Sequence, residues 1–163
     1  MELRKLNHAD AARCAELEEI LFPGETPWHR EVFEQEFIQP YNFYFGVEDE
    51  GLLVGYAGLA LRGNMDDPEF EILTIGTDPQ HQRRGIGRMM MDNICHIADL
   101  KHAPIFLEVR VGNEAAIEMY KNYGFAHLGI RRNYYQPSGA DAHTMKREIQ
   151  TQTPIQTQTP EEE

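Results

Sequence analysis

A glycine- and arginine-rich turn constrains the fold of this chain more than any other feature of its sequence. The turn reads Gln-Arg-Arg-Gly-Ile-Gly-Arg over residues 82–88. It follows an apolar run, residues 70–77, and leads into the helical spacing of Ile86, Met90 and Ile94. Glycine lets the backbone approach a ligand closely, and the first turn of a helix offers unpaired N–H groups at its positive end. This strand–turn–helix unit therefore favours a phosphate-binding turn.

A second interpretation of the same segment is a glycine-containing helix start with solvated arginines, and the segment alone leaves both open. The pattern is neither GxxxxGK[ST] nor GxGxxG, which disfavours a nucleoside triphosphatase and a dinucleotide fold. The arginines stand out because the chain carries 15 Lys and Arg against 27 Asp and Glu, a formal net charge of −12. This acidity also argues against a nucleic-acid partner.

Strand and helix signals alternate along the chain and predict an α/β fold, a mixed sheet covered by helices. Asn7 is an expected N-cap, as is Asn113, and Gly124 is an expected helix terminator. The Asp-Glu-Gly sequence at 49–51 predicts a hairpin, and residues 62–68 read as a polar loop. The expected helices cover 7–21, 30–38, a stretch from 86 onward and 113–123. The expected strands cover 42–48, 52–61, 70–77, 105–111, 125–135 and 142–149.

Composition along the chain predicts one domain over residues 1–149, followed by a disordered Gln/Thr/Pro/Glu tail over 150–163. No apolar run reaches the roughly 18–20 residues that span a bilayer, and no signal peptide is recognisable. Cys14 and Cys95 are isolated, and the seven histidines show no ligand spacing. We therefore expect a soluble cytoplasmic protein with no metal and no membrane partner. The sequence leaves the oligomeric state open.

Three polar residues near the expected phosphate turn are candidates for chemistry. Residues 105–111 alternate, so Glu108 and Arg110 share one face of the strand. Glu108 is a candidate general base, or else half of an exposed ion pair with Arg110. Tyr120, on the apolar stripe of its helix, is either a core residue or a proton donor to a leaving thiolate. Asn113 is expected to cap its helix, contact a ligand, or do both.

Together these segments resemble the GNAT N-acetyltransferase superfamily and, within it, the RimI-type protein N-terminal acetyltransferases. The resemblance extends over residues 7–149 and is sharpest at the segments 75–79, 82–87, 107–110, Asn113, Tyr120, 124–125 and 131–135. It implies the GNAT acyl-CoA N-acyltransferase fold, with a mostly antiparallel central sheet and flanking helices. It also implies acetyl-CoA as the acetyl donor.

The resemblance assigns roles to individual residues. Glu108 matches the general base, Tyr120 the general acid and Asn113 a cofactor-contacting asparagine. A further set would hold the pyrophosphate of acetyl-CoA: Arg83, Arg84, Gly85, Ile86, Gly87 and Arg88. Another would lie along its pantetheine arm: Ile75, Gly76 and Thr77.

The implied acceptor is the N-terminal alanine of the ribosomal protein bS18, and Trp28, Tyr134 and Tyr135 would line the peptide groove. Packing is the alternative role of Trp28. An α-amino group has a pKa near 7.7–8.0, against about 10.4 for lysine. A larger fraction of a protein N-terminus is therefore already deprotonated at neutral pH, and a general base has to remove its proton less often. An acidic enzyme also attracts a basic ribosomal protein. A lysine or small-amine acceptor, and a non-catalytic CoA-binding partner module, are the alternatives.

Overall fold

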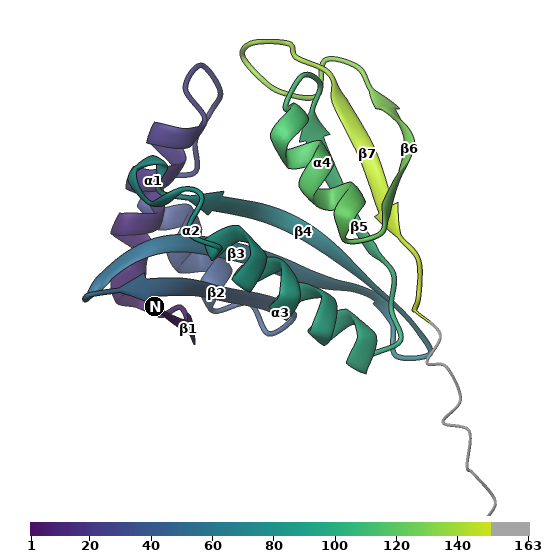
Figure 1. Ribbon diagram of the computed structural model, residues 1–163, viewed down its shortest axis with the longest axis horizontal. Coiled ribbons are helices and arrows are strands. Elements are labelled where there is room, and N and C mark those ends of the chain that lie inside the picture. The colour runs from purple at the N-terminus through teal and green to yellow at the C-terminus, as the bar shows by residue number, and fades with distance from the viewer. Residues whose placement is uncertain (151–163) are drawn as a thin grey trace, which may run out of the picture.

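The computed structural model describes residues 1–150, and within them seven strands form one sheet in the order β1-β2-β3-β4-β5-β7-β6 (Figure 1). The predicted tail, apart from Gln150, lies outside the described residues. The strands are β1 (Glu2–Lys5), β2 (Asn42–Asp49), β3 (Leu52–Asn64), β4 (Asp67–Thr77), β5 (Ile105–Arg110), β6 (Phe125–Arg131) and β7 (Ala142–Arg147). The α-helices are α1 (Ala11–Leu21), α2 (Arg30–Phe37), α3 (Ile86–Leu100) and α4 (Glu114–Asn122), and short 3-10 turns cover His8–Asp10 and Pro79–His81.

Only one neighbouring pair of these described strands, β4 and β5, runs parallel, and every other pair is antiparallel. This confirms the predicted mixed, mostly antiparallel sheet. The parallel connection passes through α3, as a crossover between parallel strands requires. β7 inserts between β5 and β6, so the last two strands return to the sheet beside β5.

The sheet separates two apolar cores, one on each face. On one face α3 packs Ile86 and Met90 against the sheet, and Tyr120 of α4 joins the same cluster. On the other face α1 and α2 pack against it, with Phe33 fully buried and Tyr56 beneath it at a ring-centroid distance of 6.0 Å. Helices on both faces explain why β3 is buried almost continuously from Leu53 to Ala60 instead of alternating.

Several helix and strand ends lie where local sequence patterns predicted them. Glu50 and Gly51 both have positive φ, +49° and +80°, which is the backbone that a two-residue hairpin needs. Asn113 caps α4 by accepting a hydrogen bond from the backbone N–H of Ala116 at 3.4 Å. Gly124 follows α4 with a φ of +92°, in the left-handed region that suits a helix terminator.

Three sequence expectations differ from the structure. The polar loop expected at 62–68 is wrong: β3 continues to Asn64 and β4 starts at Asp67, joined by a turn in which Asn64 Oδ1 accepts from two backbone N–H groups. This hairpin projects into solvent. Its residues are exposed on both faces, so the sequence shows no alternation of polar and apolar residues that would indicate a strand. β1 was not expected, because four residues are too few to show a period. Tyr134 and Tyr135 lie beyond the end of β6, in the loop before β7.

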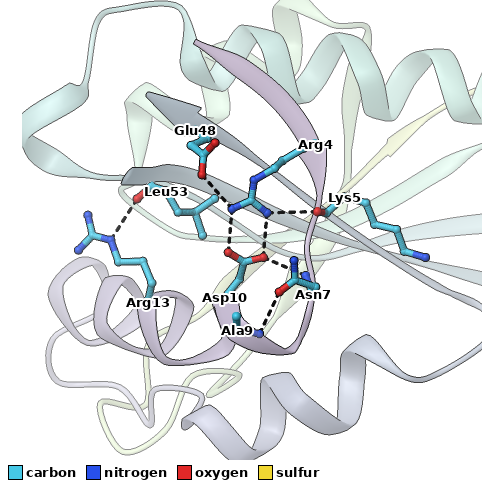
Figure 2. Close-up of polar contacts among 8 residues, drawn as sticks. All are labelled: Arg4, Lys5, Asn7, Ala9, Asp10, Arg13, Glu48 and Leu53. Atoms are coloured by element: carbon cyan, nitrogen blue, oxygen red, sulfur yellow. Dashed lines mark hydrogen bonds and ion pairs between the residues drawn. The ribbon is translucent and has the colours of Figure 1, made fainter. Parts of the chain in front are cut away.

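A polar cluster joins β1 to the start of α1 (Figure 2). The Arg4 guanidinium donates two hydrogen bonds to the Asp10 carboxylate at 2.9 and 2.8 Å, and Asp10 also accepts from the backbone N–H of Asn7 at 2.9 Å. Asn7 in turn caps the 3-10 turn by accepting from Ala9 N at 2.9 Å. Asp10 is therefore shared between a partly buried ion pair and a helix cap, and it fixes the first strand to the first helix.

Every helix in residues 1–150 is too short or too polar to cross a membrane.

Candidate functional site

The parallel strands β4 and β5 separate soon after they meet. Their pairing covers Phe70 with Ile105 and Glu71 with Phe106, after which β4 continues to Thr77 and β5 to Arg110 (Figure 1). Ile75, Gly76 and Thr77 still pair with β3 on their other side. On the edge that faces β5, this part of β4 therefore has backbone N–H and C=O groups that are not paired with another strand. Such an edge can bind an extended ligand.

The turn after β4 leads directly into the N-terminus of α3. Gly85 is the N-cap with a φ of +82°, no side chain caps this helix, and Arg83 also has positive φ, +64°. A Cβ added at Gly85 would meet no protein atom within 4 Å, so the glycine faces open space. Gly87 packs near Met119 of α4, where an added Cβ would lie 3.4 Å from the sulfur.

The three arginines of the turn are exposed. Arg84 Nη1 lies 3.0 Å from the Asp49 carboxylate at the β2–β3 hairpin, so part of its charge is shared inside the protein. The first-turn N–H groups of α3 lie at the positive end of the helix dipole, and Arg83 and Arg88 add two positive charges to the same turn, a combination typical of anion-binding sites.

Glu108 points from β5 to the face opposite the apolar core beneath α3 and α4, and its side chain is 10% exposed. It borders a cavity of about 170 Å³ together with Glu71, Phe106 and Arg131. Burial raises the pKa of Glu108, the Arg131 guanidinium acts to lower it, and the Glu71 charge raises it further. A carboxyl group in such surroundings suits a general base, because its proton affinity is increased while it remains accessible.

The alternative in which Glu108 pairs with Arg110 on an exposed face is wrong. Glu108 instead lies 3.4 Å from Arg131 Nε, and Arg110 Nη1 lies 2.8 Å from the Glu25 carboxylate. Although the two side chains share a face of β5, each has a partner from a distant loop or strand. Alternation along the strand predicted the face, whereas the partners depend on the tertiary fold.

Tyr120 is buried on α4 and packs against Phe125, with the ring centroids 5.7 Å apart. Burial and the neighbouring Tyr135 hold the pKa of Tyr120 well above its usual range. The phenol therefore keeps its proton at neutral pH, as a proton donor must. The core position predicted for Tyr120 is confirmed, and this position is compatible with the acid role. Asn113 is exposed at the start of the same helix and uses its side chain as the cap described above.

The three expected groove aromatics separate into two groups. Trp28 packs on Phe33 of α2 at a centroid distance of 5.4 Å, and it lies partly buried against the core under α1 and α2. Tyr134 and Tyr135 lie together in the β6–β7 loop, 5.0 Å apart, and the Tyr134 ring lies 5.8 Å from the Arg131 guanidinium carbon. Burial raises the pKa of Tyr134, and the Glu108 charge adds to the shift. The Arg131 side chain thus contacts both the Tyr134 ring and the candidate base.

Sequence reasoning missed a contact between two loops at the open end of the separated strands. Thr26 N, in the loop between α1 and α2, donates to Gln136 O at 2.9 Å, and Glu25 forms an antiparallel bridge with Pro137. Glu25 also accepts hydrogen bonds from Arg110 and from Ser138 Oγ. The only available signal was Arg110 itself, a cation on the face of Glu108 in an acidic chain.

Among residues 1–150, no three His, Cys, Asp or Glu side chains are grouped so as to hold a metal ion.

The fold and site define an acetyltransferase class. The model of the acetyltransferase (GNAT) family matches residues 10–125, and the chain belongs to this family, whose acetyl donor is acetyl-CoA. The chain is 46% identical over 143 residues to the N-alpha-acetyltransferase RimI of Mycobacterium tuberculosis, covering 88% of this chain and 89% of that protein. Within the family it is therefore of the RimI type.

Two further likenesses agree with this assignment. The chain is 32% identical over 145 residues to a putative ribosomal protein bS18-alanine N-acetyltransferase of Bacillus subtilis, covering 88% of this chain and 92% of that protein. The crystal structure of the ribosomal-protein-S18-alanine N-acetyltransferase from Escherichia coli superposes with a TM-score of 0.78 at 27% identity, covering 94% and 97% of the two chains. The predicted GNAT fold is confirmed.

Proposed function

We propose that this acetyltransferase modifies the α-amino group of a protein N-terminus, with the N-terminal alanine of a bS18-type ribosomal protein as its acceptor. The observation that carries the proposal is the position of Glu108, a largely buried carboxylate on the strand that separates from the free edge of β4. The likeness to RimI proteins over most of the chain supports the acceptor class.

Acetyl-CoA supplies the acetyl group as a thioester. We place its diphosphate on the first-turn N–H groups of α3, with Arg83 and Arg88 neutralising charge, and its arm along residues 75–77. Asn113, at the start of α4, is a further candidate contact. The thioester would then lie between the two strands, in reach of groups on β5 and α4.

Glu108 would take the proton from the acceptor ammonium, directly or through a water, which frees the nitrogen lone pair. The nitrogen attacks the thioester carbon, the new N–C bond forms and the C–S bond breaks. Tyr120 would donate its proton to the departing thiolate, so that CoA leaves as a thiol. The acetylated nitrogen would then lose its second proton to solvent, which leaves a neutral amide, and the Tyr120 phenolate would regain a proton from solvent. Neither Cys14 nor Cys95 is suited to a covalent route, because burial raises the pKa of the Cys95 thiol to about 11 and that of Cys14 to about 12.

An assay of free-thiol release tests the proposal with two peptides of matched sequence. One begins with a free alanine and contains no lysine, and the other is acetylated at its N-terminus and contains one lysine. We expect turnover on the free α-amine and little on the blocked peptide at neutral pH, where an α-amine is the more readily deprotonated. Preferential turnover of the blocked lysine peptide would instead identify a side-chain acetyltransferase. Tight acetyl-CoA binding without turnover of either peptide would identify a binding module.

A further inference from the structure

β4 contains a bulge close to the point where it separates from β5. Thr74 pairs with Gly58 of β3, and Ile72 pairs with the next residue of β3, Leu59. Leu73 is therefore an extra residue on β4, and the pairing of β4 with β5 ends two residues before it. Because a bulge bends its strand and increases the local twist, this one lies where it can turn the end of β4 away from β5.

A carboxyl group from α1 binds the residue that follows the bulge. Thr74 Oγ1 donates a hydrogen bond to Glu18 Oε1 at 2.6 Å, and Glu18 is only 5% exposed. The other buried residues of α1 are apolar: Ala11, Cys14 and Leu17. A buried carboxyl group is unfavourable unless it is hydrogen-bonded, so the contact with Thr74 offsets part of the cost of its burial. Glu18 therefore links α1 to the bulge of β4.

Two residues further along β4, the same face of the strand packs directly against α1 and β3. A Cβ added at Gly76 would lie 2.5 Å from Leu21 Cδ1 and 2.9 Å from Tyr56 Oη, so the strand has no space here for a shift toward α1. Thr74 and Gly76 lie on one face because side chains alternate along a strand. The α1 side of β4 is thus fixed at two successive positions of that face, whereas its edge toward β5 is unpaired in this segment.

We propose that Glu18 is a positioning residue for acetyl transfer. By holding Thr74 it fixes the bulge, and the bulge sets the direction of residues 75–77, along which we place the arm of acetyl-CoA. This inference rests on that placement, which is part of the proposed function. Because the diphosphate is held separately at α3, loss of the Glu18 contact shifts the thioester more than it weakens binding. Misplacement of a reacting group by about 1 Å lowers a rate by up to about 100-fold, so the effect falls on kcat.

Glu18→Leu removes the acceptor and keeps a side chain of similar size that suits apolar surroundings. We expect kcat on the alanine-starting peptide to fall by about 10-fold or more, with the acetyl-CoA Kd from calorimetry little changed. The thermal unfolding midpoint should stay level or rise, because leucine has no carboxyl group to desolvate. Thr74→Val removes the donor instead and should lower kcat to a similar extent.

Glu18→Gln is the conservative variant, because its amide oxygen still accepts the hydrogen bond from Thr74. We expect a kcat close to that of the parent and an unchanged pH profile of kcat/KM. Leu17→Val is the matched control, since it shortens the neighbouring buried side chain of α1 and leaves the contact between Glu18 and Thr74 in place. It should lower the unfolding midpoint and spare most of kcat.

Hydrogen exchange supplies a readout that needs no acceptor. Bound acetyl-CoA should slow the exchange of the amide N–H groups of residues 75–77 in the parent, and slow it less in Glu18→Leu. Protection that is absent in the parent, or equal in the two chains, would overturn the inference, as would an undiminished kcat in Glu18→Leu.

Two further outcomes would also overturn it. An equal loss of kcat in Glu18→Gln and Glu18→Leu would mean that the carboxyl group itself is needed, and an equal loss in Leu17→Val would assign the effect to the packing of α1. If the parent acetylates only the blocked lysine peptide, or neither peptide, the proposed function fails, and the exchange measurement still decides the role of Glu18.

Discussion

The carboxylate of Glu108 on β5 lies 3.4 Å from the guanidinium Nε of Arg131 at the end of β6, although β7 separates the two strands. Arg131 also lies beside the Tyr134 ring, so it joins the candidate base to the loop that carries both tyrosines. Two opposing effects therefore act on one carboxyl group, since burial raises its pKa and the guanidinium lowers it. The protonation of Glu108 therefore depends on both its burial and the charge of Arg131.

Replacing Glu108 by Gln removes the proton acceptor while preserving size and polarity. We expect kcat to fall by about 10² or more, the usual contribution of a general base, with little change in acetyl-CoA affinity. Stopped-time thiol release and calorimetric titration of acetyl-CoA measure the two quantities separately. A variant with the parent's turnover would exclude Glu108 as the base.

Replacing Arg131 by Gln removes the positive charge that lowers the pKa of Glu108. Glu108 must be deprotonated to act as a base, so activity declines as pH falls through its pKa. Without Arg131 that pKa rises further, and the acidic limb of the kcat/KM profile should move to higher pH. A limb that stays in place, or moves to lower pH, would contradict the electrostatic role of Arg131.

The substitution Tyr120→Phe removes only a hydroxyl group. The ring would keep its packing on Phe125, so the thermal unfolding midpoint should change little, while turnover falls by about 10² because the proton donor is lost. Phe125→Leu is the matched control, since it disturbs the same packing but leaves the phenol. We expect it to lower the midpoint and to spare most of the turnover. The reverse pattern would make Tyr120 a purely structural residue.

Gly85 combines positive φ with open space at the N-terminus of α3. Ala at this position should cost about 1 kcal/mol of folding free energy from the backbone alone, and its Cβ would enter the space that we assign to the diphosphate. We expect acetyl-CoA to bind about 10-fold more weakly, at a cost of about 1.4 kcal/mol. Gly124→Ala has similar strain and open space but lies at the far end of α4, and it should leave acetyl-CoA binding unchanged.

Asp10 should be a main contributor to the stability of the N-terminal region. Asp10→Ala leaves Arg4 without its bidentate partner and the Asn7 N–H without its acceptor, so we expect a loss of about 2–4 kcal/mol in denaturant unfolding. Asp66→Ala, at an exposed turn, is the control and should change stability little.

The same residue predicts an acid dependence. The hydrogen bond and charge of Arg4 hold the pKa of Asp10 below its usual value in the folded state. Its contribution is therefore complete above the unfolded pKa near 3.9 and is lost as pH falls through the lowered folded pKa. The stability difference between the parent and Asp10→Ala should narrow in that range. A difference that is constant down to pH 2 would contradict this.

Local signals in the sequence predicted much of the fold and part of the site. The caps at Asn7 and Asn113, the hairpin at Glu50 and Gly51, and the strand that places Glu108 away from the core each depend on a few neighbouring residues. Backbone dihedrals and side-chain periods are properties of such short segments, so they can be read without the rest of the chain. Motif resemblance added the family.

The tertiary structure alone decided how distant segments meet. The insertion of β7 beside β5 brings Arg131 to Glu108, and the contact between the α1–α2 and β6–β7 loops brings Ser138 to Glu25 across more than a hundred residues. Neither contact follows a sequence period, because both arise from how the strands stack and where β4 and β5 separate. The sequence determined which residue types stand at each position and the local backbone that holds them. Long-range packing decided which charges share a desolvated space, and that in turn decides their protonation and their partners.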